Sequence, residues 1–409
     1  MSDEPTMSDE KAQADQKSFR DLPKLGGEQT FDDLPKVEGE QTLLEEELLF
    51  AEDAVRRRRR KKTTWWHRVT RRPRQFIKKH KALSIIIGIA LLLLIILLIW
   101  LWILNHKLNG IPRFDVDLGD NRPAAAAGTN ILLVGVDDGK GVDLDEMLEG
   151  EWQPGVFRSD AIMVVHLSED GSEAQLVSIP RDSYVPVEGY GKTKINAAFS
   201  YGGPSLLGRT VEDVTGLHID HIAVADFEGF KGITEAIGGV LVYVPEDITD
   251  PRFDYVFWKK GWQQVEGDQA LEYVRARYGL PQGDFDRVQR HQNMMRAITK
   301  EVNDMSVLAN PFAVTDLVDE IAGHLAVDSS LTSGAMRSLA FDALNLGSSD
   351  ISYATAPYSG TATISGAGSV VTLELKKVRA LFNAIGHDDF ARYAADHQLE
   401  VLPDERSVN

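Results

Sequence analysis

The sequence contains no cysteine among its 409 residues. Disulfide bonds, thiolate nucleophiles and cysteine metal ligands are therefore excluded from every part of the chain. Two common catalytic patterns are missing as well. Ser178 and Ser183 do not lie in a Gly-x-Ser-x-Gly elbow, which argues against a serine hydrolase of that type. His218 and His221 do not have the HExxH spacing of a zinc protease and are interpreted as structural or surface residues.

The sequence contains only one hydrophobic run that is long enough to span a membrane. Residues 83–104 form an apolar run without any charged side chain. About 20 apolar residues cover the ~30 Å hydrocarbon core of a bilayer. A cleaved signal peptide has a shorter apolar region and lies at the extreme N-terminus. The run therefore predicts one uncleaved transmembrane helix.

Basic side chains are concentrated on one side of this run. Residues 56–82 carry 14 lysines and arginines, whereas only Lys107 follows the run closely. Such an asymmetry predicts a single-pass protein of the cell membrane with a cytoplasmic N-terminus and an extracytoplasmic C-terminal domain. Binding of nucleic acid or of a specific lipid is the alternative interpretation of the basic segment. We favour a topology signal with attraction to anionic membrane lipid, and expect no nucleic-acid partner.

The first 55 residues have an acidic composition with few aromatics, which predicts a disordered cytoplasmic tail. A twelve-residue repeat lies within the tail, at residues 19–30 and 31–42. The repeat is either a short motif that docks a cytoplasmic partner or a duplicated spacer. Thr30 and Thr42 are candidate phosphorylation sites for the first of these alternatives.

The rest of the chain divides into three predicted segments. Residues 105–128 are expected to be a linker that holds the next domain off the bilayer, residues 129–388 to be the extracytoplasmic domain, and residues 389–409 to be a C-terminal tail without a readable pattern. The chain beyond Lys107 carries 46 acidic and 24 basic side chains. An anionic substrate would therefore have to meet a local arginine cluster rather than a basic surface.

Short apolar runs alternate with helical patterns from residue 129 onward. Strands buried on both faces are predicted at residues 130–136, 161–167, 174–179, 221–227 and 240–244. Helices are predicted at residues 204–215, 227–237, 268–274, 284–302, 311–325, 333–346 and 373–385. This alternation predicts an α/β fold, a three-layer α-β-α sandwich around a mixed central sheet.

Charged residues gather where the predicted strands end. Arginines next to aspartates in these loops are typical of phosphate recognition with a divalent cation, because guanidinium forks match phosphate oxygens and carboxylates bind Mg²⁺. Asp284, Arg287 and His291 lie three and four residues apart, so they share one face of a helix. Ordinary surface salt bridges are the alternative explanation, and the residues alone do not decide between the two.

Eight sequence blocks in fixed order carry a resemblance to a known family. The chain resembles the LytR-CpsA-Psr family strongly over residues 130–305 and more weakly to about residue 385. The blocks are NILLVGVD, RSDAIMVVHL, LVSIPRDSYVPV, KINAAFSYGG, GLHIDHIAVADFEGF, GGVLVYVP, GDQALEYVRARYG and DFDRVQRHQ. The resemblance implies a membrane-anchored extracytoplasmic phosphotransferase. Its members move a glycopolymer from a polyprenyl pyrophosphate carrier to peptidoglycan and form a phosphodiester link, as in the attachment of teichoic acid or polysaccharide.

The resemblance also implies roles for individual residues. Asp137 and Asp160 would be ligands of Mg²⁺, for which Mn²⁺ could substitute. Arg181, Asp284 and Arg287 would be catalytic, with Asp284 orienting or deprotonating a nucleophile or holding Arg287 in place. The side chains around the pyrophosphate would be Arg158, Arg181, Lys194, Arg275, Arg277, Arg287 and Arg290.

Two positions depart from the pattern of the family. Asp137 is followed by Asp138 and Gly139, where the family usually has an arginine two residues after the aspartate, and Lys140 could take over that contact. The late helix of the family usually carries Arg-Gln-Gln, whereas this chain has His291 in place of the first glutamine. A histidine could still donate to a phosphate, but its charge would depend on pH.

Three other functions were weighed against the transferase. A nucleotide-binding ATPase is excluded, because Pro186 stands where a Walker loop ending at Gly191 needs a glycine. A pyrophosphatase would use the same residues with water as acceptor. A catalytically weak regulatory protein would only bind the lipid-linked precursor, but the core set of arginines and aspartates is present.

Overall fold

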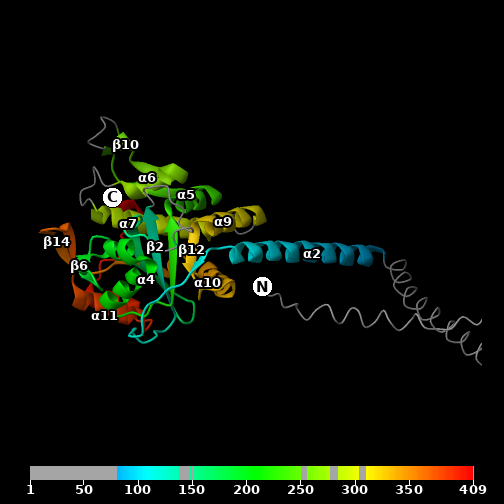
Figure 1. The fold of residues 1–409 in the computed structure, drawn as a ribbon. Helices are drawn as coiled ribbons and strands as arrows, with labels where there is room; N and C mark the ends of the chain where they lie inside the picture. The colour runs from blue at the N-terminus through cyan, green and yellow to red at the C-terminus, as the bar shows by residue number, and fades with distance from the viewer. Residues whose placement is uncertain are drawn as a thin grey trace, which may run out of the picture. The chain divides into compact units, whose positions relative to one another are not determined.

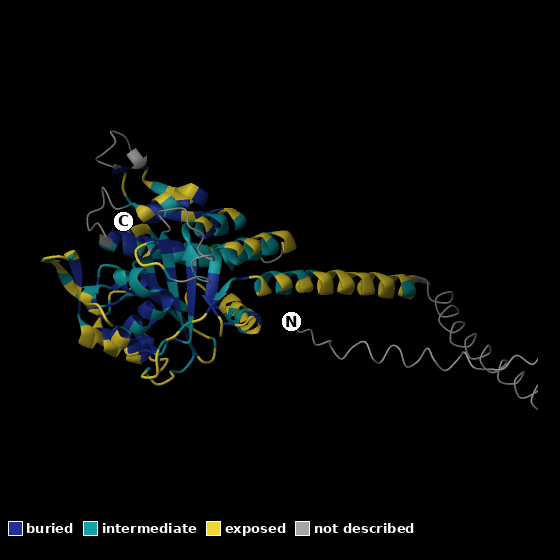
Figure 2. Cartoon of the chain, viewed as in Figure 1, coloured by how far each residue is buried: buried dark blue, intermediate teal, exposed yellow. Residues whose placement is uncertain are grey.

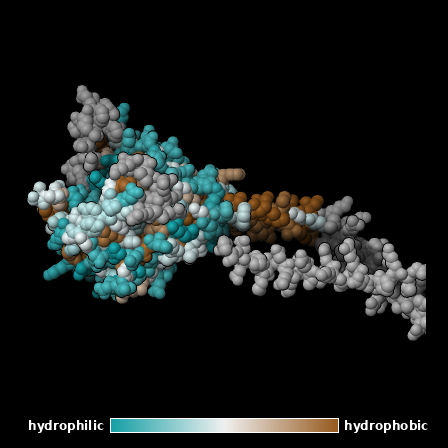
Figure 3. Space-filling model, in the orientation of Figure 1, coloured by the Kyte–Doolittle hydropathy of each residue, from teal (hydrophilic) through white to brown (hydrophobic). Residues whose placement is uncertain are grey.

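The computed structural model describes residues 81–137, 148, 152–249, 256–276, 284–303 and 310–408. The predicted disordered tail, its repeat and most of the basic segment lie outside these residues. The first described element is helix α2 (Lys81–Asn109), whose side chains up to residue 99 are almost all exposed and apolar. It is the one helix in the described part of the chain that is long and apolar enough to cross a membrane. Figure 3 shows its apolar surface in brown.

The C-terminal domain is built around a seven-stranded sheet (Figure 1). The sheet is mixed, because β1/β12, β2/β7 and β4/β13 pair in parallel whereas β12/β7, β2/β3 and β3/β4 pair antiparallel. The prediction of a mixed central sheet is confirmed. In spatial order its strands are β1 (Arg113–Phe114), β12 (Leu325–Asp328), β7 (His221–Asp226), β2 (Thr129–Asp137), β3 (Arg158–Leu167), β4 (Ala174–Ser178) and β13 (Ile351–Thr355).

Helices cover both faces of this sheet, which confirms the predicted three-layer sandwich (Figure 1). One face is covered by α4 (Ile195–Thr215) and α11 (Leu375–Ile385). On the other side lie α5 (Phe227–Ala236), α6 (Gly267–Arg275), α7 (Asp284–Val302) and α9 (Pro311–His324). Helix α10 (Ser333–Asn345) follows β12. The observed helices agree with the predicted ranges within about two residues at most ends.

Burial of β2 differs from the prediction of a strand buried on both faces. Its residues alternate, because Leu132, Val134 and Val136 are fully buried against α4, whereas Ile131 and Leu133 on the other face are half-buried. Figure 2 shows the sheet mainly in the buried and intermediate colours, in contrast to the exposed α2. Strand β4 does match the prediction, since all five of its residues are buried. The α4 face of the sheet thus holds the main hydrophobic core.

Helix α4 begins nine residues before the predicted start at Pro204. Gly202 and Gly203 have non-helical dihedral angles, and the φ of Gly203 is 63°, so two helical pieces meet there at a kink. A Cβ at Gly203 would lie 3.0 Å from the ring of Trp152, which leaves no room for a side chain. The glycines and the proline look like a helix start in the sequence, which hid the first piece, residues 195–201.

A second, smaller core fixes the helices beside the pocket described below. Strands β8 (Val240–Val244) and β11 (Gly261–Val265) form an antiparallel pair that packs on Tyr273 of α6 and Met294 of α7. The other two-stranded ladders are β5 (Tyr184–Val187) with β6 (Gly191–Lys194), β9 (Ile248–Thr249) with β10 (Val256–Trp258), and β14 (Tyr358–Ile364) with β15 (Gly368–Leu373).

Segments expected to be a linker and a tail are packed into the domain. Strand β1, from the predicted linker 105–128, pairs with β12 in the main sheet. At the other end, α12 (Phe390–His397) follows α11, the Leu402 amide donates to the Tyr353 carbonyl oxygen at 2.8 Å, and Val408 is fully buried. Both segments therefore belong to the folded unit. Strand β1 has only two residues and α12 only eight, so neither is long enough to give a clear periodic pattern in the sequence.

Candidate functional site: an arginine-lined pocket

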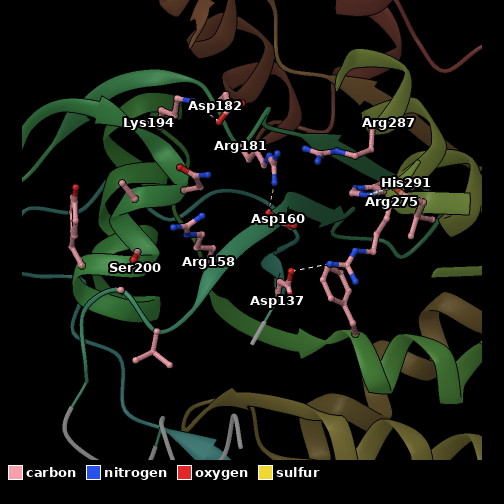
Figure 4. A pocket seen from close by; sticks show the side chains of 17 residues that line it. Asp137, Arg158, Asp160, Arg181, Asp182, Lys194, Ser200, Arg275, Arg287 and His291 are labelled. Carbon is pink, nitrogen blue, oxygen red and sulfur yellow. Dashed lines mark hydrogen bonds and ion pairs between the residues drawn. The ribbon is translucent and has the colours of Figure 1, made fainter. Parts of the chain in front are cut away.

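One end of the β2–β3 pair opens into a pocket of about 960 Å³. Strand β2 ends at Asp137 and β3 begins at Arg158, and these two residues face each other across the antiparallel ladder. Hydrogen bonding between the strands therefore fixes both side chains at the same edge of the sheet. Figure 4 shows side chains from the strands, from α4 and from α6 and α7 converging on this space.

A β-bulge places the second aspartate. Gly135 pairs with Ala161 and Val136 pairs with Ser159, so Asp160 is an extra residue that has no partner in the register of β2. A bulge redirects the side chain that it contains and is common beside functional sites. The Asp160 carboxylate lines the pocket and forms an ion pair with the Arg181 guanidinium, drawn as a dashed line in Figure 4.

Arg181 and Lys194 lie near the two ends of the link between β4 and α4, which contains β5 and β6. The Ser183 amide donates to the Pro180 carbonyl oxygen at 2.9 Å, which closes a turn directly after the strand. The Asn196 amide in the first turn of α4 donates to the Arg181 carbonyl oxygen at 3.1 Å. Lys194 is the N-cap residue of α4, and its Nζ lies 3.2 Å from Asp182 Oδ1. The link fixes both cations next to the positive end of the α4 dipole.

Arg275 reaches the pocket from the opposite side. It is the last residue of α6, and its Nη2 donates to Asp137 Oδ2 at 3.0 Å. Its guanidinium carbon lies 4.8 Å from the centre of the Phe227 ring, at the start of α5. Stacking on an aromatic face orients a guanidinium and leaves its edge able to donate hydrogen bonds. Phe227 is thus a supporting residue, and nothing in its sequence context indicated this role.

Two side chains of α7 complete the wall, in agreement with the predicted shared helix face. Arg287 and His291, one turn apart, both line the pocket. His291 Nε2 lies 3.0 Å from the Val274 carbonyl oxygen and must donate to it, since a carbonyl only accepts. Burial and the neighbouring Arg287 lower the pKa of His291 to about 4. The imidazole is therefore neutral at pH 7, with Nδ1 unprotonated.

The structure does not bring all predicted phosphate ligands to the pocket wall. Arg290 is fully buried; its guanidinium carbon lies 4.6 Å from the centre of the Tyr273 ring, and its Nη1 donates to the Tyr273 carbonyl oxygen at 3.2 Å. A helix turns about 100° per residue, so a residue three positions after Arg287 points about 60° away from it, here toward α6. Arg277 lies outside the described residues, as do Asp138, Gly139 and Lys140. Asp284 begins α7, and its side chain is outside the description.

The charge of the pocket contrasts with that of the domain around it. Five basic and three acidic side chains line the pocket, which gives it a net charge of +2 with His291 neutral. Such a concentration of arginines favours an anion with several oxygens, such as a pyrophosphate. The wall also includes three residues from the first piece of α4 that were not predicted from the sequence, Asn196, Ser200 and Tyr201. They lie in residues 195–201, the helical piece that the two following glycines made difficult to predict.

The pocket fits a divalent cation held together with a substrate. Asp137 and Asp160 both line it, and Mg²⁺ commonly binds one or two carboxylates plus substrate phosphates. The described part of the chain contains no group of three or more acidic or histidine side chains arranged as a complete metal site. Each carboxylate instead faces an arginine, Arg275 or Arg181. A cation would therefore need the oxygens of an anionic ligand to complete its coordination.

The fold and the pocket together define an α/β domain that has an arginine-lined pocket next to two carboxylates and follows a candidate membrane-spanning helix. A family model named the LytR_cpsA_psr family matches residues 110–384, about two thirds of the sequence. The chain belongs to this family, as the resemblance indicated.

Curated relatives carry names from cell wall biosynthesis. The chain is 41% identical over 207 residues to the probable cell wall biosynthesis protein LcpB of Corynebacterium glutamicum. The match covers 50% of this chain and 49% of the relative. It is 31% identical over 346 residues to the cell wall biosynthesis protein LcpA of the same organism, and this match covers 74% of this chain and 65% of the relative. The chain thus spans about half to two thirds of the length of these relatives.

Solved structures share the fold. The crystal structure of TagV from B. subtilis has a TM-score of 0.52 and 25% identity, and the match covers 65% of this chain and 98% of TagV. The structure described as TagT bound to LIIa-WTA has a TM-score of 0.51 and 22% identity, over 68% of this chain and all of TagT. An enzyme of the family from Actinomyces oris has a TM-score of 0.51 and 20% identity, over 68% of this chain and 96% of that one.

Proposed function

We propose that this protein transfers a glycopolymer from a polyprenyl pyrophosphate carrier to peptidoglycan and forms a phosphodiester link. The observation that carries the proposal is the pocket, in which arginines from β3, the β4–α4 link, α6 and α7 meet beside two carboxylates. A pyrophosphate is the ligand class that such a set matches. Family membership and the names of the relatives support a cell wall polymer as the group that is transferred.

We further propose that α2 anchors the protein in the cell membrane, with the N-terminus in the cytoplasm and the domain outside. This location brings the pocket to a carrier that resides in the same membrane. The acceptor, peptidoglycan, lies on the same side as the domain. The twelve-residue repeat of the tail is kept as a proposed docking motif for a cytoplasmic partner.

The reaction is a displacement at the glycan-linked phosphorus. An acceptor hydroxyl oxygen attacks this phosphorus and forms the new P–O bond, while the bond to the bridging oxygen breaks and polyprenyl phosphate leaves. Arg181 and Arg287 donate to the oxygens that gain charge, and Arg158, Lys194 and Arg275 hold the remaining oxygens in place. Such catalysis rests on positioning and on charge stabilisation in the transition state. The donor is already activated, so no nucleotide is required.

Asp137 and Asp160 would hold Mg²⁺, or Mn²⁺ in its place. When bound, the cation supplies positive charge to the pyrophosphate oxygens. Asp284 begins α7 one turn before Arg287, and we propose that its carboxylate accepts the proton of the acceptor hydroxyl or holds Arg287 in position. His291 contributes no proton at neutral pH, because its pKa is about 4.

The test uses full-length protein in lipid vesicles, a synthetic polyprenyl-pyrophosphate glycan, Mg²⁺ and short peptidoglycan strands. The mass of the strands reports attached glycan. We expect transfer by the wild type and its loss in Arg181→Ala and in Asp160→Ala. Binding of the carrier without transfer or cleavage in the wild type would instead identify a regulatory binding protein.

A further inference from the structure

Two helices of the domain lie against the end of the membrane-spanning helix. Trp100 Nε1 of α2 donates to Thr315 Oγ1 of α9 at 3.0 Å, and Lys107 Nζ forms an ion pair with Asp319 one turn further along α9. From residue 100 to residue 107 the chain leaves the predicted span, which ends at residue 104. Since Thr315 pairs with the earlier position and Asp319 with the later one, the N-terminal end of α9 points toward the membrane.

Helix α10 contacts α2 in the opposite direction. Ser333 Oγ is hydrogen-bonded to the Asn109 side chain, and the Arg337 guanidinium, one turn later, is hydrogen-bonded to the Asn105 side chain. Asn109 is farther from the span than Asn105. The chain of α10 therefore runs toward the membrane, and its C-terminal turns are nearest to it.

Large apolar side chains are exposed at these two membrane-facing ends. Phe312, three residues before Thr315 and ~4.5 Å closer to the membrane along the axis of α9, is 79% exposed. Phe341 and Leu344 lie four and seven residues after Arg337 and are 68% and 42% exposed. With Arg337 they share one face of α10, since residues at i, i+4 and i+7 lie on the same side of a helix.

The charged and the apolar side chains of this region lie at different distances from the membrane. Lys107, Arg337 and Asp319 lie where α2 leaves the predicted span, at the height of lipid headgroups, and the apolar side chains lie beyond them toward the acyl chains. Asp316 of α9, which is exposed, limits how far that helix can enter, so only its first turn can reach the acyl boundary. Trp100 fits the aromatic belt at the same boundary.

We propose that the membrane-proximal ends of α9 and α10 form a lipid-contacting surface in which Phe312, Phe341 and Leu344 insert at the headgroup–acyl boundary of the bilayer. The occupant is the bilayer itself, because the exposed apolar side chains continue the apolar surface of α2 on its membrane side. The domain is then held in one orientation on the membrane rather than on a free tether. This inference rests on the proposed membrane anchoring by α2.

The absence of cysteine makes a direct test simple, since each introduced cysteine is the only thiol. Full-length Phe312→Cys, Phe341→Cys and Leu344→Cys are spin-labelled in lipid vesicles, and collision rates with lipid-soluble oxygen and with a water-soluble nickel chelate are compared. Leu92→Cys in α2 is the membrane control. Leu375→Cys at the start of α11, 41% exposed in the folded domain, is the water control.

We expect labels at residues 312, 341 and 344 to favour oxygen, as at residue 92, and the label at residue 375 to favour the nickel chelate. Labels that favour the nickel chelate at all three sites would overturn the inference. Low rates with both reagents would also overturn it, because they would indicate contact with another protein copy. If residue 92 itself favours the nickel chelate, the anchor fails, and this outcome is distinct from a failure of the α9–α10 surface alone.

A functional consequence can be measured with the same surface. Phe312→Glu combined with Phe341→Glu should lower transfer from a long-chain donor embedded in vesicles and leave transfer from a short-chain, water-soluble donor unchanged. Both side chains are exposed, so the folded domain should tolerate the change. Equal transfer from both donors by the variant and the wild type would contradict the proposed orienting role.

Discussion

Arginine–carboxylate pairs occur in two different regions of this domain. In the last turns of α4, Glu212 is 3% exposed and accepts hydrogen bonds from Arg122 Nε and Nη2 and from the Ile219 amide. In the pocket, the Arg181–Asp160 and Arg275–Asp137 pairs line a cavity, and the Asp137 and Arg275 side chains are 29% and 49% exposed. The chemistry is the same, but the surroundings are a core in one case and a cavity in the other.

The comparison indicates what separates a structural ion pair from a functional one. The Arg122–Glu212 pair connects the segment after β1 to α4 and to the loop before β7. It therefore stabilises the fold and is not available to a ligand. In the pocket, a ligand can reach the charged atoms, and a pyrophosphate with its cation can exchange partners with both pairs. The two kinds of pair should therefore respond in opposite ways to substitution.

The largest effect is expected for Arg181. Arg181→Ala should lower glycan transfer by about 100-fold or more, because removing one donor to a developing charge typically costs that much. Arg181→Lys should restore only part of the rate, since an ammonium cannot reproduce the guanidinium fork. Transfer is measured by mass, and Arg122→Ala serves as the matched control. An equal loss of transfer in Arg181→Ala and Arg122→Ala would contradict the distinction between functional and structural ion pairs.

Glu212 should produce the next effect, on stability and not on transfer. Glu212→Gln leaves Arg122 without its charged partner and should lower the free energy of unfolding by about 2 kcal/mol, a value below the usual range for a buried pair because Arg122 is 28% exposed. Denaturant unfolding of the full-length protein in detergent measures this change. A normal unfolding midpoint combined with lost transfer would assign Glu212 to the site instead.

Substitution of Asp137 should change the Mg²⁺ dependence of transfer. Asp137→Asn should raise the Mg²⁺ concentration needed for half-maximal transfer by about tenfold. Asp182→Asn is the control, because Asp182 also lines the pocket but pairs with Lys194. A Mg²⁺ titration of transfer distinguishes the two variants. The same shift in both would mean that the pocket responds to net charge and not to a ligand at Asp137.

His291 should show the smallest effect. Its pKa is lowered to about 4, so between that value and ~6.5 the unfolded chain binds more protons than the folded protein. The histidine therefore lowers stability as the pH falls through this window, by about 1–2 kcal/mol at most. His291→Gln should remove this pH dependence and leave transfer at pH 7 nearly unchanged. The free energy of unfolding of both proteins at pH 5 and pH 7 tests this prediction. If the transfer rate of the wild type has a bell-shaped pH profile that His291→Gln flattens, the imidazole takes part in catalysis.

Periodic elements could be predicted from the sequence because their apolar spacing is imposed by burial. Helix α7 has the predicted bounds, Asp284–Val302. Asp137 is the last residue of β2, and Arg181 follows β4 closely, so both lie at the ends of predicted apolar runs. Since charged residues follow those runs directly, most of the pocket wall could be selected in advance. The resemblance to the family supplied the roles that charge and spacing left open.

Features that depend on tertiary contact could not be predicted. The bulge at Asp160 is a matter of register between two strands, and Phe227 supports Arg275 only because α5 and α6 pack together. Arg290 carries the same charge as Arg287, but its direction is decided by Tyr273. The kink at Gly202 and Gly203 concealed a helix piece, since two glycines before a proline suggest a start and not a continuation.

The most direct test of the account follows which bond is broken. Full-length protein in vesicles is incubated with the polyprenyl-pyrophosphate glycan and peptidoglycan strands in water enriched in oxygen-18, and the products are identified by mass. The account predicts polyprenyl phosphate and strands that carry glycan through one phosphate without the heavy isotope. Free glycan phosphate that contains the heavy isotope would contradict it, because water and not peptidoglycan would then be the acceptor.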